Sequence, residues 1–302
     1  MTEPQLGGSY EDLLFAAQAA ESAGLHGFSR SDHYYSGQPG LPTSDAFTTM
    51  GGVARETSRT RLCVLVSPIT FRHPAVIAKA ATSIDEMSKG RFDLGVGTGW
   101  MKAEHDAFGL PFPPLDERFD RLEESLQYLR AAFTGNEFEG RYYRIKADVR
   151  PRPTALRLIV GGTGAVKTPT LAGRFADEYN HSLIAPARLH VKLERMRDAA
   201  VEAGRDPASI TVSVMGPALL SPNGRRLSDL IRKAAAVRGD KFVELEERWT
   251  KDWVPRGTPD EAAEALAAFS AVGVKKFYFQ WFDLTNREGI VEQVELGARL
   301  KL

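Results

Sequence analysis

The stretch Arg61-Leu62-Cys63-Val64-Leu65-Val66 is a short apolar run of the kind that forms a buried β-strand. A polar turn, an amphipathic segment at Pro74–Met87 and a glycine follow it, and a second apolar run begins at Phe92–Val96. This succession predicts a βαβ unit with parallel strands. Because the same order of segments recurs along the chain, we expect an α/β fold.

The recurring order predicts seven strands, and helices lie between them. The strands are predicted at Gly27–Ser31, Arg61–Val66, Phe92–Val96, Leu158–Val160, Tyr179–Leu183, Ile210–Met215 and Lys276–Trp281. The helices are predicted at Ser9–Ser22, Ser44–Thr57, Pro74–Met87, Asp116–Phe133, Pro169–Ala176, Pro186–Ala203, Pro259–Val272 and Arg287–Leu300. Phe138–Ile145 is predicted to form a hairpin. The charged segment Arg225–Trp253 is predicted to be mostly helical, with no assigned place in the fold.

The number of strands bears on the architecture, because a closed (β/α)8 barrel needs eight of them. The chain begins with the helix that should follow strand one, and residues 1–8 are polar with glycine and proline, which makes a poor buried strand. An open doubly wound sheet is the alternative, but no glycine fingerprint joins a first strand to a helix. We therefore predict a single TIM (β/α)8 barrel domain over residues 1–302, with insertions and with the first strand missing or degraded.

Composition excludes several classes of protein. The 302 residues carry 39 Lys+Arg and 39 Asp+Glu, and this zero net charge argues against nucleic-acid binding. One cysteine, Cys63, excludes an internal disulfide framework and a multi-cysteine zinc site, and no metal site is predicted. No signal peptide and no membrane-spanning apolar run is visible. We expect a cytoplasmic protein that binds a small molecule and neither a nucleic acid nor a membrane.

Candidate catalytic residues are sought where strands end, because barrel chemistry lies there. The second barrel strand ends in Ser31-Asp32-His33, and a histidine beside a carboxylate suits proton transfer near neutral pH. The alternative, of equal weight, is that Asp32 caps the turn and His33 is a surface residue. Pro68, after the third strand, indicates a bulge or a cis bond. Arg72 is interpreted as an anion ligand or as a donor to loop carbonyls.

Two glycine-containing turns are candidate ligand loops. Gly95–Gly99 has alternating glycines that either let a ligand approach the backbone or allow tight packing in the barrel. Gly161-Gly162-Thr163-Gly164 precedes a helix, where free N–H groups bind phosphate, although a simple turn is the alternative. Shortly after Gly95–Gly99, the residues Glu104–Asp106 form a polar cluster that we interpret as a solvated face.

Taken in order, these pieces resemble the bacterial luciferase-like family of flavin and deazaflavin oxidoreductases over roughly Ser9–Leu302. The resemblance rests on the following segments: Ser31–His33, Thr70–Val76, Gly90–Trp100, Glu104-His105, Glu117–Glu124, Ile159–Gly164 and Ala176–Asn180. It implies a TIM-type barrel with a flavin-type ring at its carboxyl-terminal mouth. The branch most resembled implies dependence on the deazaflavin coenzyme F420.

The resemblance assigns roles residue by residue. Asp32 would contact the cofactor, and His33 would donate or accept a proton beside the reacting ring carbon. A bulge made by Val66, Ser67, Pro68 and Ile69 would back the ring, often with a non-prolyl cis peptide. Thr98 and Gly99 would approach the polyol or phosphate of the cofactor. Its phosphate would be held by Gly161, Gly162, Thr163 and Gly164.

The chain departs from the family at three places, one of which is Met101, where many relatives carry Asn. Trp100 stands where some deazaflavin relatives have an acidic residue, which argues against a sugar-phosphate substrate. The first strand of the family has no counterpart, so either the start codon is assigned too late or the chain is truncated. An exposed edge on each neighbouring strand would lower solubility or weaken cofactor binding.

Three functions remain open on this basis. The leading hypothesis is an oxidoreductase that moves a hydride between F420 and a small organic substrate. The first alternative is an FMN-dependent luciferase-like monooxygenase, and the second is a degenerate, non-catalytic flavin-binding barrel. The resemblance is compatible with a homodimer. The substrate is not specified by the sequence.

Overall fold

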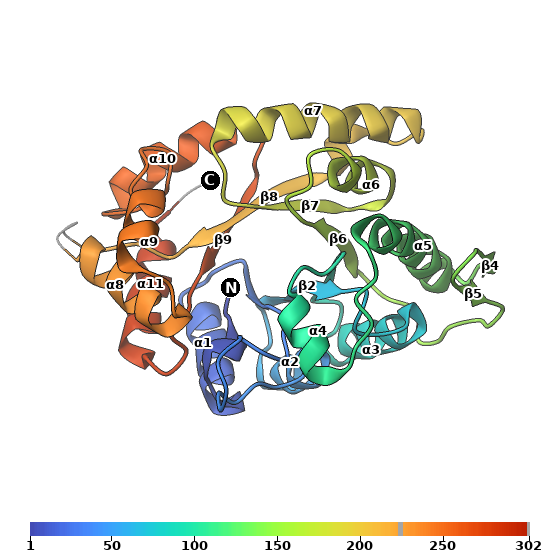
Figure 1. The fold of residues 1–302 in the computed structure, drawn as a ribbon, viewed down its shortest axis with the longest axis horizontal. Helices are drawn as coiled ribbons and strands as arrows, with labels where there is room; N and C mark the ends of the chain where they lie inside the picture. The colour runs from blue at the N-terminus through green and yellow to red at the C-terminus, as the bar shows by residue number, and fades with distance from the viewer. Residues whose placement is uncertain (223–225, 301–302) are drawn as a thin grey trace.

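The structure, a computed structural model, describes residues 1–222 and 226–300. Seven parallel strands form one sheet in the order β1-β2-β3-β6-β7-β8-β9, and helices surround it (Figure 1). The strands of this sheet are β1 (Gly27–Arg30), β2 (Arg61–Pro68), β3 (Phe92–Gly97), β6 (Arg157–Gly161), β7 (Glu178–Ser182), β8 (Thr211–Pro217) and β9 (Lys276–Gln280). The predicted TIM-type barrel with a missing first strand is confirmed.

The predicted helices alternate with the strands, and one further helix, α4, was not predicted. The helices are α1 (Tyr10–Ser22), α2 (Ala46–Glu56), α3 (Pro74–Met87), α4 (Lys102–Phe108), α5 (Leu115–Thr134), α6 (Lys167–Phe175), α7 (Pro186–Glu202), α8 (Leu227–Arg238), α9 (Phe242–Trp249), α10 (Pro259–Ala271) and α11 (Arg287–Gly297). Two 3-10 turns are η1 (Pro4–Leu6) and η2 (Pro207–Ser209). The predicted hairpin is the two-stranded sheet of β4 (Phe138–Glu139) and β5 (Arg144–Ile145). Arg225, at the start of the predicted charged segment, and residues 301–302 lie outside the described residues.

Local signals account for where several helices begin. Ser9 and Asp12 form a capping box at α1, and Thr258 and Glu261 form another at α10. Asp45 caps α2 through the N–H of Thr48. No helix in the described residues is long and apolar enough to cross a membrane.

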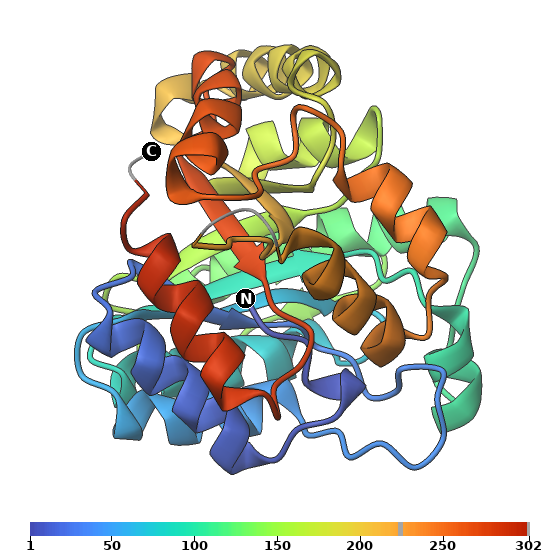
Figure 2. The ribbon, with the colours of Figure 1, turned by 90° about the vertical axis from the view of Figure 1, so that its left-hand side faces the viewer.

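The place of the missing strand is partly taken by the N-terminal residues, which run beside β9 (Figure 2). Thr2 forms single parallel bridges to Arg30 and to Trp281. The N–H of Thr2 donates to Ser29 at 2.8 Å, and the N–H of Trp281 donates to Met1 at 2.8 Å. We expected the edges of β1 and β9 to be exposed. That expectation is wrong at their carboxyl ends, because this short segment satisfies backbone groups on both edges.

The two faces of the sheet differ in character. Along β2, alternate side chains point to opposite faces, so Leu62 and Val64 pack with the outer helices while Cys63 and Leu65 do not. Cys63, Leu65 and Ile159 form a smaller cluster with Met1, Met215 and Tyr278. The barrel interior is therefore filled by side chains rather than open.

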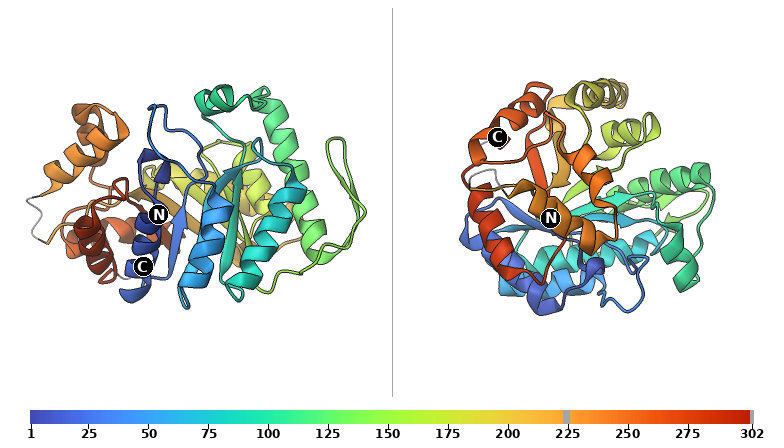
Figure 3. Two further views of the ribbon diagram at one scale, coloured as in Figure 1. Left: turned by 90° about the horizontal axis from the view of Figure 1, so that it is seen from below. Right: turned by 60° about the vertical axis from the view of Figure 1, so that its left-hand side comes forward.

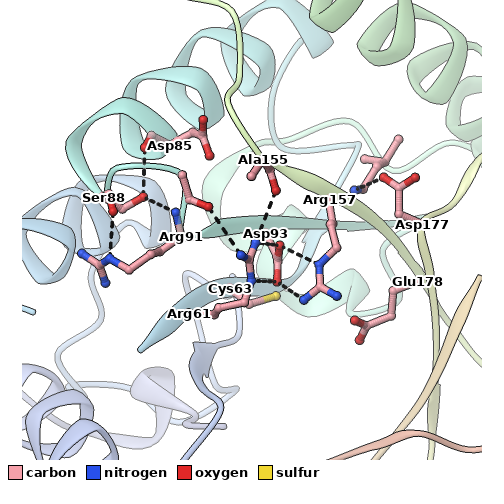
Figure 4. A network of polar contacts seen from close by, with 12 residues as sticks. Arg61, Cys63, Asp85, Ser88, Arg91, Asp93, Ala155, Arg157, Asp177 and Glu178 are labelled. Atoms are coloured by element: carbon pink, nitrogen blue, oxygen red, sulfur yellow. Dashed lines mark hydrogen bonds and ion pairs between the residues drawn. The ribbon is translucent and has the colours of Figure 1, made fainter. Parts of the chain in front are cut away.

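A layer of alternating charge closes the amino ends of the strands (Figure 4). The carboxylate of Asp93 accepts hydrogen bonds from Arg61 and from Arg157, and it is only 2% exposed. Glu178, on β7, accepts hydrogen bonds from Lys276 and, at 2.9 Å, from the hydroxyl of Tyr278, both on β9. The buried carboxylates of this amino-end network are thus neutralised by cations, which for Asp93 come from the two strands beside it and for Glu178 from β9, two strands away.

At the carboxyl ends, three insertions gather on the same end of the barrel (Figure 3). They are the loop after β1, helix α4, and helices α8 and α9. The loop and α8 are in contact, because the side-chain amide of Gln38 donates to the carbonyl of Val237 at 3.4 Å. The charged segment whose place the sequence did not specify, which contains α8 and α9, therefore lies near the carboxyl ends of the strands.

Candidate active site

The loop that follows β1 places His33 against a buried carboxylate. Nδ1 of His33 lies 2.9 Å from Oε1 of Glu104, whose other oxygen accepts the N–H of Tyr34 at 3.1 Å. Glu104 is 1% exposed, while the side chain of His33 is 15% exposed. His33 is therefore not the surface residue of the alternative interpretation. In the described part of the chain, its Nε2 has no hydrogen-bond partner.

Charges around His33 set its protonation. Burial acts to lower the pKa of His33, but the hydrogen bond and the charge of Glu104, together with the charges of Glu3 and Asp32, raise it above its ordinary value. An imidazole with one nitrogen held by a carboxylate and the other free can take up and release a proton in a defined direction. This pair is the site's candidate acid–base group.

Asp32 lies behind His33 and is held by two partners. It accepts the Ser67 hydroxyl at 2.7 Å and the guanidinium of Arg72 at 2.5 Å, and it is 1% exposed. Arg72 also pairs with Asp45 and donates to Tyr34. Arg72 therefore binds carboxylates of the protein itself. The two interpretations from the sequence, a ligand for an external anion and a donor to loop carbonyls, are both wrong. The cofactor contact of Asp32 stays a prediction.

The bulge on β2 and the glycines on β3 fit together. The register against β3 shifts between Val64 and Ser67, and the non-prolyl peptide Leu65–Val66 is cis. A bulge is thus confirmed, but the cis bond precedes Val66 and is not at Pro68. A Cβ on Gly95 would lie 2.9 Å from the Val66 side chain, and one on Gly161 would lie 2.6 Å from it. Packing against Val66 thus favours glycine at both positions, and at Gly95 the backbone carbonyl of Val64, 2.6 Å from the same Cβ, excludes a side chain as well.

Three further predicted residues lie at the same strand ends. Ile69 is buried and its N–H donates to the carbonyl of Gly97 at 3.0 Å. Gly99 has a φ of +77°, and its carbonyl accepts from Arg118. Thr98 precedes it and is partly exposed. Whether Val66, Ser67, Pro68, Ile69, Thr98 and Gly99 contact a cofactor stays a prediction.

The interpretation of Glu104 and His105 as a solvated face is wrong. Both lie on α4 and both are buried, at 1% and 0% exposure. His105 contacts Thr70 through Nε2 at 2.7 Å and the carbonyl of Met101 through Nδ1 at 2.8 Å. α4 has only seven residues, so its sequence shows too little periodicity to reveal its buried side. The matching Glu104-His105 segment of the family resemblance was the one signal for this role.

Glu3 is a second carboxylate that the sequence did not point to. It is 5% exposed, and it accepts the side-chain amides of Gln5, at 2.6 Å, and of Gln280. Its segment is polar and carries no motif. Glu3 reaches the site only because the N-terminal residues lie between β1 and β9.

The turn from β6 to α6 presents backbone donors. No protein acceptor is found, within the described residues, for the N–H groups from Thr163 to Thr168, whereas the N–H of Gly162 donates to Asn180 at 3.1 Å. Helix α6 has no side-chain cap at Val166. Unsatisfied N–H groups before a helix favour an anion. Phosphate binding by Gly161, Gly162, Thr163 and Gly164 stays a prediction that this geometry supports.

His181 lies next to this turn, from the end of β7. Burial lowers the pKa of His181 to about 4, so its imidazole is neutral at pH 7. Its Nδ1 contacts the Ser182 carbonyl at 2.5 Å, and its Nε2 has no partner although the residue is 2% exposed. Within the described residues, no group of three or more His, Cys, Asp or Glu is arranged to hold a metal ion.

Comparisons with known proteins agree with this architecture. Residues 2–276 match a family model described as luciferase-like monooxygenase. A protein named F420-dependent glucose-6-phosphate dehydrogenase, from Gordonia bronchialis, is 28% identical over 298 residues, covering 89% of this chain and 86% of that protein.

Solved structures show the same fold at lower identity. An F420-dependent secondary alcohol dehydrogenase in complex with an F420-acetone adduct aligns with a TM-score of 0.81 at 19% identity, over 97% of this chain and 94% of that one. The monooxygenase RslO1 from Streptomyces bottropensis aligns with a TM-score of 0.82 at 21% identity, over 99% of this chain and 98% of that one.

Proposed function

This chain belongs to the luciferase-like monooxygenase family, and on that premise we propose that it moves a hydride between coenzyme F420 and a small, uncharged organic substrate. It is a luciferase-like oxidoreductase, and the F420-dependent relative in the preceding comparison supports the finer assignment. The observation that carries the proposal is the His33–Glu104 pair, whose free Nε2 lies at the carboxyl end of β1.

The residues present fit a coenzyme with a planar ring and a phosphate. Within residues 1–222 and 226–300, the N–H groups from Thr163 to Thr168 lack acceptors, and the buried Nε2 of His181 has no partner. Thr163, Gly164 and the first turn of α6 would hold the phosphate, and the side chain of Val66, lying against Gly95 and Gly161, would back the ring. When bound, the deazaflavin supplies a ring carbon that accepts or releases a hydride.

The work of the protein is to manage the proton that accompanies the hydride. When an alcohol is oxidised, its C–H electron pair leaves as hydride, and its O–H proton passes to the free Nε2 of His33. The charge of Glu104 stabilises the imidazolium that forms, and its hydrogen bond fixes the ring orientation. In the reverse direction, His33 returns this proton to the carbonyl oxygen.

The charges at this site favour an uncharged substrate. The charges that act most strongly on His33 are the carboxylates Glu104, Glu3 and Asp32, and the nearby Arg72 is engaged by Asp32 and Asp45. A substrate phosphate beside His33 would meet this negative charge, and the nearby guanidinium of Arg72 is already paired. Trp100, 71% exposed, stands edge-on to His33 with ring centroids 5.8 Å apart and offers an apolar wall.

The cofactor assignment is tested by titrating the chain with F420 and FMN in parallel and following oxygen uptake by each reduced coenzyme. We expect tighter binding of F420 and little oxygen consumption. Tighter binding of FMN with rapid oxygen uptake would instead establish the monooxygenase alternative. Binding of neither coenzyme would favour the degenerate barrel.

The substrate class is tested with the F420-loaded chain. We expect turnover of secondary alcohols and none of glucose 6-phosphate. Trp100→Ala is expected to raise KM with a smaller effect on kcat, whereas Phe108→Ala, an exposed aromatic on α4, serves as the matched control. Efficient oxidation of glucose 6-phosphate would contradict the assignment of an uncharged substrate while leaving the cofactor assignment intact.

A further inference from the structure

The turn between β6 and α6 is held from outside by a lysine of α7. Nζ of Lys192 donates to the carbonyl of Thr163 at 2.7 Å and to the carbonyl of Gly164 at 3.2 Å. These two contacts join the turn to α7 through a lysine that lies 28 residues beyond Gly164 in the sequence. They act on the backbone, so they fix the orientation of two successive peptide groups.

The orientation of these two peptide groups also fixes the direction of their N–H groups. In a trans peptide, the N–H of a residue points opposite to the carbonyl of the residue before it. Because the carbonyls of Thr163 and Gly164 face Lys192, the N–H groups of Gly164 and Ala165 face away from it. Both belong to the run of donors without acceptors in the described residues. The lysine thus turns two donors toward the open side of the turn.

The turn has little room to adopt another shape. A Cβ on Gly164 would lie 2.5 Å from the hydroxyl of Thr168, so only glycine allows this close approach. The buried His181, whose Nε2 is unpartnered, lies beside the backbone of Thr163. The turn is therefore packed into one shape, and the buried His181 lies close to its backbone.

Lys192 has no carboxylate partner within the described residues, so a salt bridge does not explain its position. The charged residue one helical turn before it is Arg188, of the same sign, and side chains four apart share one face of a helix. Ordering a lysine side chain costs conformational entropy, and a like charge nearby adds to that cost. Its hydrogen bonds to Thr163 and Gly164 offset this cost.

We propose that Lys192 is a positioning residue that presets the Thr163–Thr168 donors for a phosphate group, without touching the coenzyme ring or the substrate. This inference rests on the proposed function insofar as that phosphate belongs to the coenzyme. Lys192 raises affinity for the phosphate end of the ligand because the donors need no rearrangement on binding.

The test compares ligands that differ by the phosphate. FMN and riboflavin form one pair, and F420 and its phosphate-free deazaflavin chromophore form the other. Dissociation constants are measured for the full chain, for Lys192→Met, for Lys192→Arg, and for Arg195→Met as a control on the same helix. Thermal unfolding of each variant is followed with and without inorganic phosphate.

We expect Lys192→Met to weaken the phosphate-bearing ligand of at least one pair about tenfold while leaving the phosphate-free ligands, and kcat at saturating coenzyme, unchanged. Lys192→Arg should keep most of the affinity, and Arg195→Met should keep all of it. Stabilisation by inorganic phosphate should be lost in Lys192→Met alone.

Equal losses for both members of a pair, or no loss in any ligand and in phosphate stabilisation, would overturn the inference. If the full chain binds neither coenzyme, the proposed function fails. The inorganic-phosphate measurement then decides the role of Lys192 by itself, because it needs no coenzyme.

Discussion

The two ends of the barrel both bury carboxylates, but they treat them differently. At the amino end, Asp93 accepts from two arginines (Figure 4). Glu178 accepts from a lysine and a tyrosine, so the charges of both carboxylates are matched. At the carboxyl end, Glu104 holds one nitrogen of His33 and leaves the other free. Among the residues that the structure describes, the six N–H groups from Thr163 to Thr168 also have no acceptor.

The contrast separates groups that hold the fold from groups that await a ligand. A buried polar group without a partner costs free energy, and a protein keeps several of them together where a ligand completes them. Saturated networks at the other end contribute to folding alone. Variants at the two ends should therefore fail in different assays.

The largest effect is expected from His33→Ala. Loss of the acid–base group should lower turnover by about 10²–10⁴-fold, as is typical of general acid–base residues. Because the substitution also removes the Nδ1 contact with buried Glu104, the midpoint of thermal unfolding should fall as well, and turnover is therefore measured below the midpoint of the variant. The matched control is His190→Ala, an exposed histidine that also pairs with a glutamate four residues away. Unchanged turnover in His33→Ala would remove this residue from the mechanism.

At the amino end, Asp93→Ala should act on stability and not on chemistry. It leaves Arg61 and Arg157 facing each other without their shared carboxylate. Breaking such a buried network costs about 3–5 kcal/mol in the free energy of unfolding, measurable by denaturant titration. Asp148→Ala removes a carboxylate that pairs with Arg150 and Arg152 on the surface, and it should leave stability unchanged. Similar losses in both variants would contradict the comparison.

The pH dependence of turnover should show the effect of Glu104 on the pKa of His33. Because the carboxylate raises the pKa of His33, the rise of alcohol oxidation with pH should lie above the ordinary histidine range. Glu104→Gln removes the charge and leaves burial to dominate, so this limb should move to lower pH. The profile of kcat/KM against pH measures the shift. A limb that stays in place would show that another group titrates.

The smallest effect is expected in the pH dependence of stability at His181. Its pKa is about 4 in the folded chain and about 6.5 when unfolded, so the unfolded state binds more protons between these values. Stability should fall by about 2 kcal/mol as the pH drops from about 7 to about 5. His33, with a raised pKa, contributes in the opposite direction: its share is present at low pH and is lost as the pH rises through its folded pKa.

His181→Gln should remove the fall in stability at low pH that comes from His181 and keep the opposite contribution of His33. Denaturant unfolding at both pH values measures this difference, with His190→Ala as the control at an exposed position. An equal fall in stability in His181→Gln and the unaltered chain would show that His181 does not titrate as described.

Local patterns were sufficient for the elements of the fold. The predicted strand over Phe92–Val96 is β3 (Phe92–Gly97), and the predicted helix Pro74–Met87 is α3 with the same bounds. The absence of a regular first strand also followed from residues 1–8, which are polar. These features are local, because hydrophobic periodicity and capping residues act within a few positions of one another.

Local sequence patterns predicted only some of the residues of the candidate site. Asp32 and His33 were found because they end a strand, and the glycine turn because glycines precede a helix. Glu104 was misinterpreted, and Glu3 and Lys192 were not identified, because each meets its partner across a long stretch of chain. His33 and Glu104 are separated by 71 positions and Lys192 and Thr163 by 29.

The sequence by itself thus determined the order of the strands and of the longer helices, and its family resemblance determined the barrel class. Only the tertiary structure decided which carboxylate holds His33, which lysine faces the glycine turn and how the N-terminal residues pair with β1 and β9. Periodicity records which side of a helix or strand is buried, whereas a pairing between distant residues depends on how every element packs.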